Sequence, residues 1–173
     1  EKFVVFAQPV DTVHLVARRL EAELGAGTVS LIIGGQSTDD RRRQIERFRQ
    51  RSRTRVLVSS RSGGEGINLQ VSRNLVHFDV PWNPGRMEQR NGRIDRVLQR
   101  ADKVRCHYFF FTQRPEDRVL QALVRKTEAV AARWTEPEAR RDGLKPYGAE
   151  AEARGAGQLV LVGEVERRVL PQL

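Results

Sequence analysis

Short apolar runs alternate with longer amphipathic segments along most of the chain, and this alternation limits the folds that it can adopt. Runs rich in β-branched and aromatic residues predict strands over residues 3–7, 29–34, 55–60, 74–79 and 104–112. Apolar residues at helical spacing predict helices over residues 11–24, 38–51, 85–100 and 115–134. Strands joined by helices form right-handed βαβ units in a mainly parallel sheet that is covered on both faces. The sequence therefore predicts an α/β fold, a three-layer αβα sandwich.

This alternation weakens near residue 136, where polar residues, Gly, Pro and Ala take over. We predict one domain over residues 1–135, followed over 136–173 by a linker and the start of a C-terminal extension. The apolar run at 159–170 predicts a short strand and a helix. Because the chain opens on Glu1, directly before a strand, we expect it to be a piece of a longer protein.

The charge balance favours a phosphate-rich partner. The net charge is +9 and the pI is about 10.8, which attracts polyanions. Only four of the 31 basic residues are lysine, and arginine adds a bidentate geometry that suits phosphate. An arginine-rich genome would produce the same bias, so charge alone leaves the partner open.

Cysteine and histidine usage excludes several kinds of site. The single cysteine, Cys106, permits no internal disulfide and no cysteine-based zinc cage, and we expect it in a buried strand. The three histidines are widely spaced, so we predict no metal ligands in this chain. The sequence has no signal peptide and no apolar stretch of about eighteen residues, so we expect a cytoplasmic chain without membrane contact.

Polar segments follow three of the predicted strands. They read "AQPVDT" after the first strand, "SSRSGGEGINLQ" after the third and "PWNPGRMEQRNGRIDR" after the fourth. Ligands of open α/β sheets bind in the crevice beyond the carboxyl ends of the strands. Because parallel strands bring these ends to one edge, the sequence predicts a ligand site there.

The glycine-rich segment "GGEGIN", residues 63–68, has two interpretations. Adjacent glycines let the backbone approach a phosphate closely, a following helix start would offer free N–H donors, and Asn68 suits a sugar hydroxyl. A plain strand-to-helix turn would have the same composition. The segment is no Walker A loop, because no GK[ST] follows it.

The arginines of "QRNGRIDR" and its flanks are also ambiguous at this point. On the predicted helix 85–100, five arginines lie on one side, within a stripe of roughly 120°. These are Arg86, Arg90, Arg93, Arg96 and Arg100. Such a stripe is typical of a solvated basic face, of a nucleic-acid patch, or of a catalytic device aimed at a phosphate. Composition and spacing do not choose among the three.

The order of these segments resembles the motifs of the second, C-terminal RecA-like lobe of superfamily two helicases. It is most similar to the Swi/Snf-type double-stranded DNA translocases. The resemblance covers about residues 2–112, through "FVVFAQ", "GGQSTDDRRRQIERF", "SSRSGGEGINLQ" and "VHFDVPWNPGRMEQRNGRIDR". The variant with "PWNP" and "QRNGRIDR" is similar to a bacterial group that includes the helicase-like component of the DISARM phage-defence system.

The resemblance implies catalytic and nucleotide-binding roles for individual residues. Arg93 and Arg96 match two arginine fingers that reach the ATP γ-phosphate, because a preorganised guanidinium stabilises charge on the transferring phosphoryl group. Gln89 matches a residue that lines the same cleft. The segment that couples the nucleotide to DNA is matched by Gly64, Glu65, Gly66 and Asn68.

The same resemblance implies contacts with the DNA backbone by Gln8, Ser59, Ser60 and Arg61. Arg61 stands where the family commonly has an acidic or other non-basic residue, which puts the detail of that contact in doubt. Leu98 replaces a usual glycine, which puts a helix end in doubt.

By this resemblance the chain is half of a composite site. ATP and Mg²⁺ are expected as cofactors, bound mainly by an N-terminal RecA-like lobe of the same protein, with double-stranded DNA as the partner and a nucleoid-associated location. Since the chain has neither a GK[ST] nor an acidic box for magnesium, we expect it to be inactive alone. The alternatives are a non-catalytic nucleic-acid-binding module and an RNA-directed superfamily two lobe. A Rossmann-like enzyme is disfavoured, because no GxGxxG follows the first strand.

Overall fold

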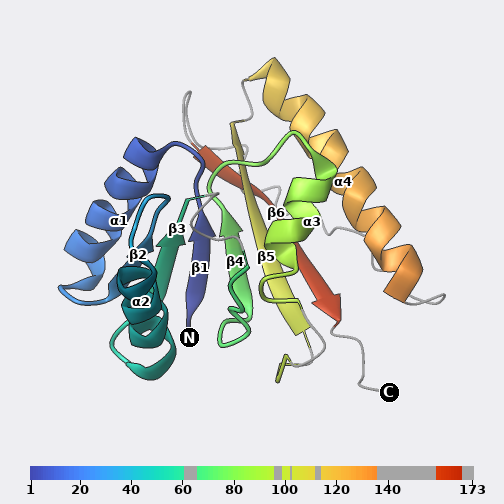
Figure 1. Ribbon diagram of the computed structural model, residues 1–173. Helices are drawn as coiled ribbons and strands as arrows, with labels where there is room; N and C mark the ends of the chain where they lie inside the picture. The colour runs from blue at the N-terminus through green and yellow to red at the C-terminus, as the bar shows by residue number, and fades with distance from the viewer. Residues whose placement is uncertain (61–65, 96–98, 102, 112–113, 136–158, 169–173) are drawn as a thin grey trace.

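The computed structural model describes residues 1–60, 66–95, 99–101, 103–111, 114–135 and 159–168. Its six strands form one sheet in the order β2-β3-β1-β4-β5-β6 (Figure 1). The strands are β1 (Phe3–Phe6), β2 (Val29–Ile32), β3 (Val56–Ser59), β4 (Asn74–His77), β5 (Lys103–Phe111) and β6 (Leu159–Arg168). The first five are parallel, and β6 pairs antiparallel with β5. The predicted, mainly parallel sheet is confirmed.

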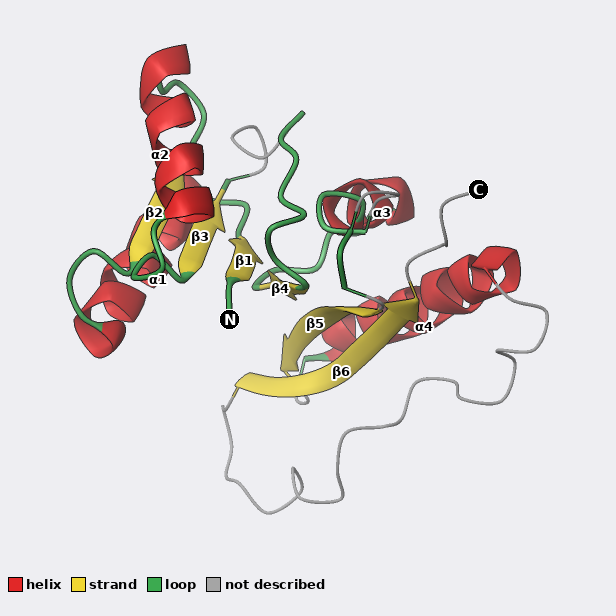
Figure 2. Cartoon of the chain, turned by 90° about the horizontal axis from the view of Figure 1, so that it is seen from below, coloured by secondary structure: helices red, strands yellow, loops and turns green. Residues whose placement is uncertain are grey.

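Helices cover both faces of this sheet, as predicted. They are α1 (Val10–Leu24), α2 (Thr38–Gln50), α3 (Pro84–Asn91) and α4 (Pro115–Thr135). Val13 and Ala17 of α1 pack into one apolar cluster, whereas Phe48 of α2, Met87 of α3 and Leu120 of α4 pack into the other. Figure 2 shows α1 and α2 on opposite sides of the strands. The molecule is therefore the predicted αβα sandwich.

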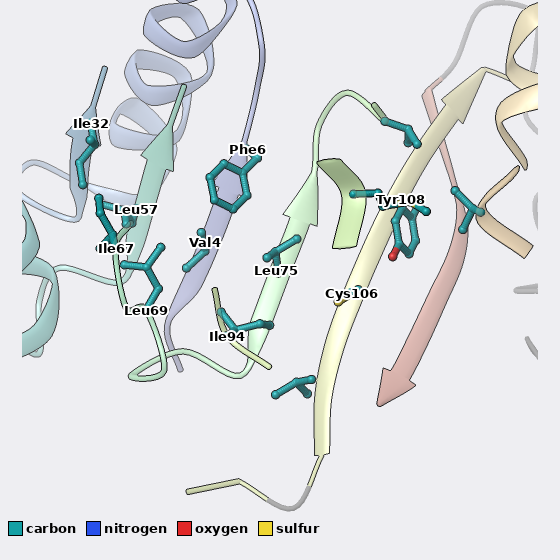
Figure 3. Packing of buried hydrophobic residues seen from close by; sticks show 14 of the residues in the cluster. Val4, Phe6, Ile32, Leu57, Ile67, Leu69, Leu75, Ile94, Cys106 and Tyr108 are labelled. Carbon is teal, nitrogen blue, oxygen red and sulfur yellow. The ribbon is translucent and has the colours of Figure 1, made fainter. Parts of the chain in front are cut away.

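The strands feed the two clusters in alternation, because successive side chains of a strand point to opposite faces. Val4 and Phe6 of β1 enter the larger cluster on the α2 side, and Val5 enters the smaller one under α1. In Figure 3, Val4, Leu57 and Leu75 line up across neighbouring strands of the larger cluster. Burial of each such side chain contributes about 1.5–3 kcal/mol, so these central strands hold the sheet together.

The start of α2 follows the capping signal in its sequence. Ser37 accepts a hydrogen bond from the Asp40 amide over 3.1 Å, as expected of an N-cap serine. This hydroxyl, followed by the Arg43 guanidinium, lowers the pKa of the Asp40 carboxyl. On the inward side of the helix Phe48 is fully buried and Ile45 packs against the same cluster, as predicted.

Three local expectations are wrong. The helix predicted over 85–100 begins at Pro84 but ends at Asn91. The described residues 66–73 after the glycine-rich segment form turns and loop rather than a helix start. The segment predicted as a short strand and helix at 159–170 is one strand, β6, over Leu159–Arg168, because it pairs along the whole length of β5. The division at residue 135 stays a prediction.

Within the part of the chain that the structure describes, no helix is long and apolar enough to cross a membrane. The same residues hold no group of three His, Cys, Asp or Glu side chains arranged to bind a metal ion. Cys106 is buried in β5, as expected from its apolar surroundings in the sequence.

Candidate functional site

Two predicted site segments meet at the carboxyl edge of the sheet. Strands β1 and β4 are neighbours, and the Phe78 amide donates to the Phe6 carbonyl over 3.0 Å just beyond them. One residue further, the backbone N–H of Gln8 donates to Oδ2 of Asp79. Gln8 is exposed, so its side-chain amide is available at this edge to a ligand. The expected convergence of the segments after β1 and β4 is therefore present.

Asp79 also holds the following helix in place. Its Oδ1 accepts from both Nη1 and Nη2 of Arg90, each over 3.1 Å, and its backbone carbonyl accepts from Nη1 over 2.8 Å. The Arg90 guanidinium lies 5.4 Å from the centre of the Phe6 ring, a cation–π contact. Arg90 is only 7% exposed. These contacts give Arg90 a packing role within the fold.

The last turn of α3 is fixed by a buried polar network. Oδ1 of Asn91 lies 2.7 Å from Nε2 of His77 in β4, and its Nδ2 donates to the Tyr108 hydroxyl in β5 over 3.1 Å. The rings of His77 and Tyr108 stack with centroids 4.7 Å apart. All three residues are inaccessible to solvent. Because each makes hydrogen bonds inside the core, the end of α3 has one defined position against β4 and β5.

This network explains why the helix stops at Asn91 and why the predicted arginine stripe does not form. Gly92 follows as the C-cap, and a Cβ there would lie only 3.3 Å from the Glu88 carbonyl. The amides of Arg93 and Ile94 then bond back to the carbonyls of Arg90 and Asn91, which makes a tight turn. Ile94 is fully buried. Its burial draws the chain toward the core, away from the straight path of a helix.

The turn brings two predicted motifs together. The Leu69 amide, within "GINLQ", donates to the Arg93 carbonyl over 3.0 Å. Nε2 of Gln99 reinforces the junction by donating to the carbonyls of Ser72 and Ile94, over 3.0 and 2.9 Å. Figure 3 shows Leu69 and Ile94 among the residues of the larger cluster. The two segments are thus joined by hydrogen bonds.

Of the two predicted fingers, the structure describes Arg93. Arg93 lies in the turn after α3 and is 8% exposed. Arg96 lies outside the described residues. Gln89 lies on the exposed side of α3, where its amide is accessible.

The predicted nucleotide-coupling segment is described only in its second half. Gly66 has a φ of +76°, a conformation that a residue with a side chain adopts only with strain. Asn68 forms a local turn, since its Oδ1 accepts from the Gln70 amide over 3.0 Å and its Nδ2 donates to Oε1 of Gln70. Its carbonyl accepts from Arg49 of α2 over 2.6 Å. Gly64 and Glu65 lie outside the described residues.

The two serines predicted to face DNA are buried in this structure. Ser59 and Ser60 are 0% and 2% exposed. The Ser59 hydroxyl donates to the Ser60 carbonyl over 3.0 Å, and the Ser60 hydroxyl accepts from the Gly34 amide over 3.2 Å. A direct contact of these hydroxyls with a nucleic-acid backbone requires the end of β3 to open. Arg61, which is also predicted to contact the DNA backbone, lies outside the described residues.

Sequence reasoning missed Asp79 and the network of His77, Asn91 and Tyr108. A signal for Asp79 was present, because it is a carboxylate directly beyond the carboxyl end of a parallel strand. The network had no such signal, since its members come from three elements and only the tertiary structure brings them together.

Comparisons with known proteins agree on one domain family. The family model described as the helicase conserved C-terminal domain matches residues 1–98. A relative from Bacillus subtilis named "Uncharacterized ATP-dependent helicase YqhH" is 41% identical over 76 residues, which are 44% of this chain and 14% of the relative. The RNA polymerase-associated protein RapA of Vibrio cholerae is 29% identical over 170 residues, 98% of this chain and 15% of RapA. The chain thus spans about one seventh of the length of these relatives.

A solved structure supports the fold. The C-terminal part of the Fun30 ATPase domain superimposes with a TM-score of 0.62 at 23% identity, over 71% of this chain and 39% of that one. At this identity the likeness concerns the arrangement of the sheet and helices. It agrees with the RecA-like architecture expected from the order of the motifs.

Proposed function

The chain belongs to the family of helicase conserved C-terminal domains, and from this premise we propose that it is the C-terminal lobe of an ATP-dependent DNA translocase of the Swi/Snf type. The order of its four motifs supports the Swi/Snf assignment. The names of the relatives, an ATP-dependent helicase and an RNA polymerase-associated protein, support an ATP-dependent function on nucleic acid. A location at the bacterial nucleoid follows from DNA as the partner.

The observation that carries the proposal is the hydrogen bond between the Leu69 amide and the Arg93 carbonyl. It joins the motif assigned to nucleotide coupling with the motif assigned to the fingers. A ligand that changes the conformation of either segment therefore changes the other. This is the mechanical link that a translocase needs between its nucleotide and its DNA.

In the proposed reaction, Arg93 and Arg96 stabilise the negative charge that builds on the transferring γ-phosphoryl group. Each finger contributes roughly 10³–10⁵ in rate, or about 4–7 kcal/mol of the barrier. The ion pair of Arg90 with Asp79 and the hydrogen bonds of Asn91 hold the backbone from which Arg93 projects. A fixed backbone lets the guanidinium adopt one geometry when it swings toward the phosphate.

The remaining contacts divide between nucleotide and nucleic acid. Gln89, on the exposed side of α3, orients the nucleotide together with Gly64, Glu65, Gly66 and Asn68. The described residues contain no carboxylate cluster that fits Mg²⁺, and we assign the metal to an N-terminal RecA-like lobe. For the DNA backbone, Gln8 and Arg61 are the primary contacts. Ser59 and Ser60 would join them only after β3 opens at its end.

Because the site is split between two lobes, hydrolysis depends on their relative position. DNA that bridges the lobes would bring Arg93 and Arg96 close to a nucleotide on the first lobe and so stimulate turnover. Closure with ATP and opening after hydrolysis would then advance the pair along the duplex.

Alanine substitutions at the two fingers, made in the full-length protein, test this function. Arg96→Ala and Arg93→Ala should each lower DNA-stimulated ATP turnover by about 10³-fold or more, because phosphoryl charge loses its guanidinium partner. The affinity for duplex DNA should stay within about twofold of wild type. Arg93→Lys should stay inactive, because an ammonium lacks the planar fork of donors.

Arg86→Ala is the matched control, since Arg86 lies exposed on α3 just upstream. Its turnover should equal that of wild type. Circular dichroism would check that each variant is folded. Turnover above a tenth of wild type in Arg96→Ala would overturn the finger assignment, and stimulation by single-stranded RNA rather than duplex DNA would favour the RNA-directed alternative.

A further inference from the structure

A second basic feature begins at the end of the motif "GGQSTDDRRRQIERF" and continues beyond it. In "RFRQRSRTR" every second residue from 47 to 55 is arginine, and no acidic residue interrupts the run. We call Arg47, Arg49, Arg51, Arg53 and Arg55 the arginine cluster. The run spans the end of α2 and the connection to β3.

The backbone that carries the arginine cluster is rigid. The Arg51 amide donates to the Arg47 carbonyl over 3.1 Å, and the Thr54 amide donates to the Arg51 carbonyl over 3.2 Å. Thr54 is fully buried, and its hydroxyl donates to the Gly27 carbonyl over 3.1 Å. Nζ of Lys2 donates to the carbonyls of Arg51 and Thr54 over 3.0 and 3.1 Å. Arg51, Arg53 and Arg55 therefore lie on a turn that is held by hydrogen bonds on both sides.

This turn lies at the amino edge of the sheet, opposite the predicted ligand edge. The Phe3 amide, at the start of β1, donates to the Arg55 carbonyl over 2.8 Å. In Figure 1 the end of α2 and the N-terminus lie together at the lower side, while the arrowheads of β1, β3 and β4 point to the upper side. A ligand on the arginine cluster would thus be separate from one at Gln8 and Asp79.

Three members of the arginine cluster present their charges to solvent. Arg51, Arg53 and Arg55 are exposed. Among the described residues, no carboxylate pairs with any of the three, whereas Arg42 and Arg43 earlier in α2 pair with Asp39 and Asp40. Arg47 and Arg53 even converge, since Nη2 of one and Nε of the other lie 3.5 and 3.7 Å from a Cβ built on Gly27.

The stability of helix α2 accounts for Arg47 and Arg49 in its last turn, but not for the three arginines that follow. Cations near a helix C-terminus stabilise it, but the effect falls off beyond the last turn, and Lys2 already donates to carbonyls there. Arg51, Arg53 and Arg55 lie beyond that turn, where their mutual repulsion opposes folding. A bound polyanion would remove this repulsion.

We propose that the arginine cluster is a second contact for the phosphate backbone of duplex DNA, at the amino edge of the sheet. Phe48 is fully buried and the rest of the run is polar, so this stretch offers no apolar anchor of the kind that protein partners use. Exposed guanidiniums on a fixed turn suit phosphate oxygens instead. The contact goes beyond the proposed function, because it requires neither ATP nor the first lobe.

Salt-dependent DNA binding tests this contact in the full-length protein. Fluorescence anisotropy with a labelled 40-base-pair duplex would be measured over a range of KCl concentrations, for wild type and for the triple variant Arg51→Gln, Arg53→Gln, Arg55→Gln. The slope of log K against log salt is negative, and each lost phosphate contact reduces its magnitude by about 0.9. For this triple variant, called the cluster variant below, the magnitude of the slope should therefore fall by about 2–3. Its Kd for the duplex should rise about tenfold or more at low salt.

The matched control removes three exposed charges from α4, by Arg118→Gln, Arg125→Gln and Lys126→Gln. It should keep the wild-type slope within about 0.5. An equal loss in both variants would mean that net charge alone acts, and would overturn the proposal. Wild-type binding by the cluster variant would also overturn it, and would leave an acidic protein surface as the partner class.

ATP turnover without DNA separates this proposal from the proposed function. The cluster variant should keep its DNA-independent turnover while it loses salt-dependent affinity. Arg93→Ala should lose ATP turnover and keep its salt-dependent affinity for DNA. If the full-length protein has no ATP turnover, the proposed function is contradicted. The salt-dependent binding curves would still test whether the arginine cluster contacts DNA.

Discussion

Arginines at the two edges of the sheet meet opposite environments. Beyond the carboxyl end of β4, Arg90 and Arg93 are 7% and 8% exposed, and Arg90 is held by Asp79. Before the amino end of β3, Arg53 and Arg55 are exposed, and no carboxylate of the described residues pairs with them. Arg90 therefore serves the fold at one edge, whereas Arg53 and Arg55 stay exposed at the other. The contact with the Asp79 carboxylate makes the difference for Arg90.

If the carboxyl edge depends on buried polar contacts, removal of the central one should have the largest effect on stability. Asn91→Leu would take a hydrogen-bond partner from His77 and from Tyr108, both inaccessible to solvent. Each such loss costs roughly 1–3 kcal/mol, so we expect the free energy of unfolding to fall by about 3 kcal/mol. Urea denaturation measures it. Gln89→Leu, the same type of change at an exposed position of α3, should change it by less than about 0.5 kcal/mol.

The ion pair between Arg90 and Asp79 should come second. Arg90→Met keeps an apolar stem on Phe6 but leaves the carboxylate of Asp79 without its guanidinium. Breaking a fully buried pair costs about 3–5 kcal/mol, and because the Asp79 side chain is 31% exposed we expect about 2 kcal/mol here. Thermal and urea unfolding measure the change. A loss no greater than that of Arg86→Met, at an exposed position of the same helix, would show that the pair is not what holds α3.

The arginine cluster should give the smallest change in stability. Neutralisation of Arg51, Arg53 and Arg55 to Gln removes no ion pair within the described residues and relieves repulsion. We expect the free energy of unfolding to stay within about 0.5 kcal/mol of wild type, with any gain confined to low salt. Urea denaturation at low and high KCl would measure this. A loss above about 1 kcal/mol would mean that these arginines stabilise the fold, and the contrast between the edges would disappear.

Most of the architecture was predictable because it depends on periodicity. The alternation of apolar runs with amphipathic segments located β1 to β5 and the helices α1, α2 and α4 to within about two residues. The error in α3 has a local cause. A stripe of arginines continued the helical spacing past residue 91, but Asn91 and Ile94 turn into the core, and Gly92 permits the close approach to the Glu88 carbonyl. Spacing does not reveal which polar residue will be buried.

The site was predictable in its segments and less so in its side chains. Motif order pointed to Gln8, Gln89, Asn68 and Arg93, and among these the structure exposes Gln8 and Gln89. Ser59 and Ser60 are buried, because the end of β3 is hydrogen-bonded on one side to the segment after β1 and on the other to the end of β2 and the residues after it. The roles of the fingers stay predictions until the kinetic test is made.

The sequence by itself determined the class of the fold and the family, because both depend on the order of elements and motifs along the chain. The tertiary structure alone decided which arginines are enclosed and which face solvent. Burial of a guanidinium requires a carboxylate or a carbonyl at the right place in space, and Asp79 meets Arg90 only because β1, β4 and α3 are packed together. At the amino edge no carboxylate of the described residues pairs with Arg51, Arg53 or Arg55, and their charges remain at the surface.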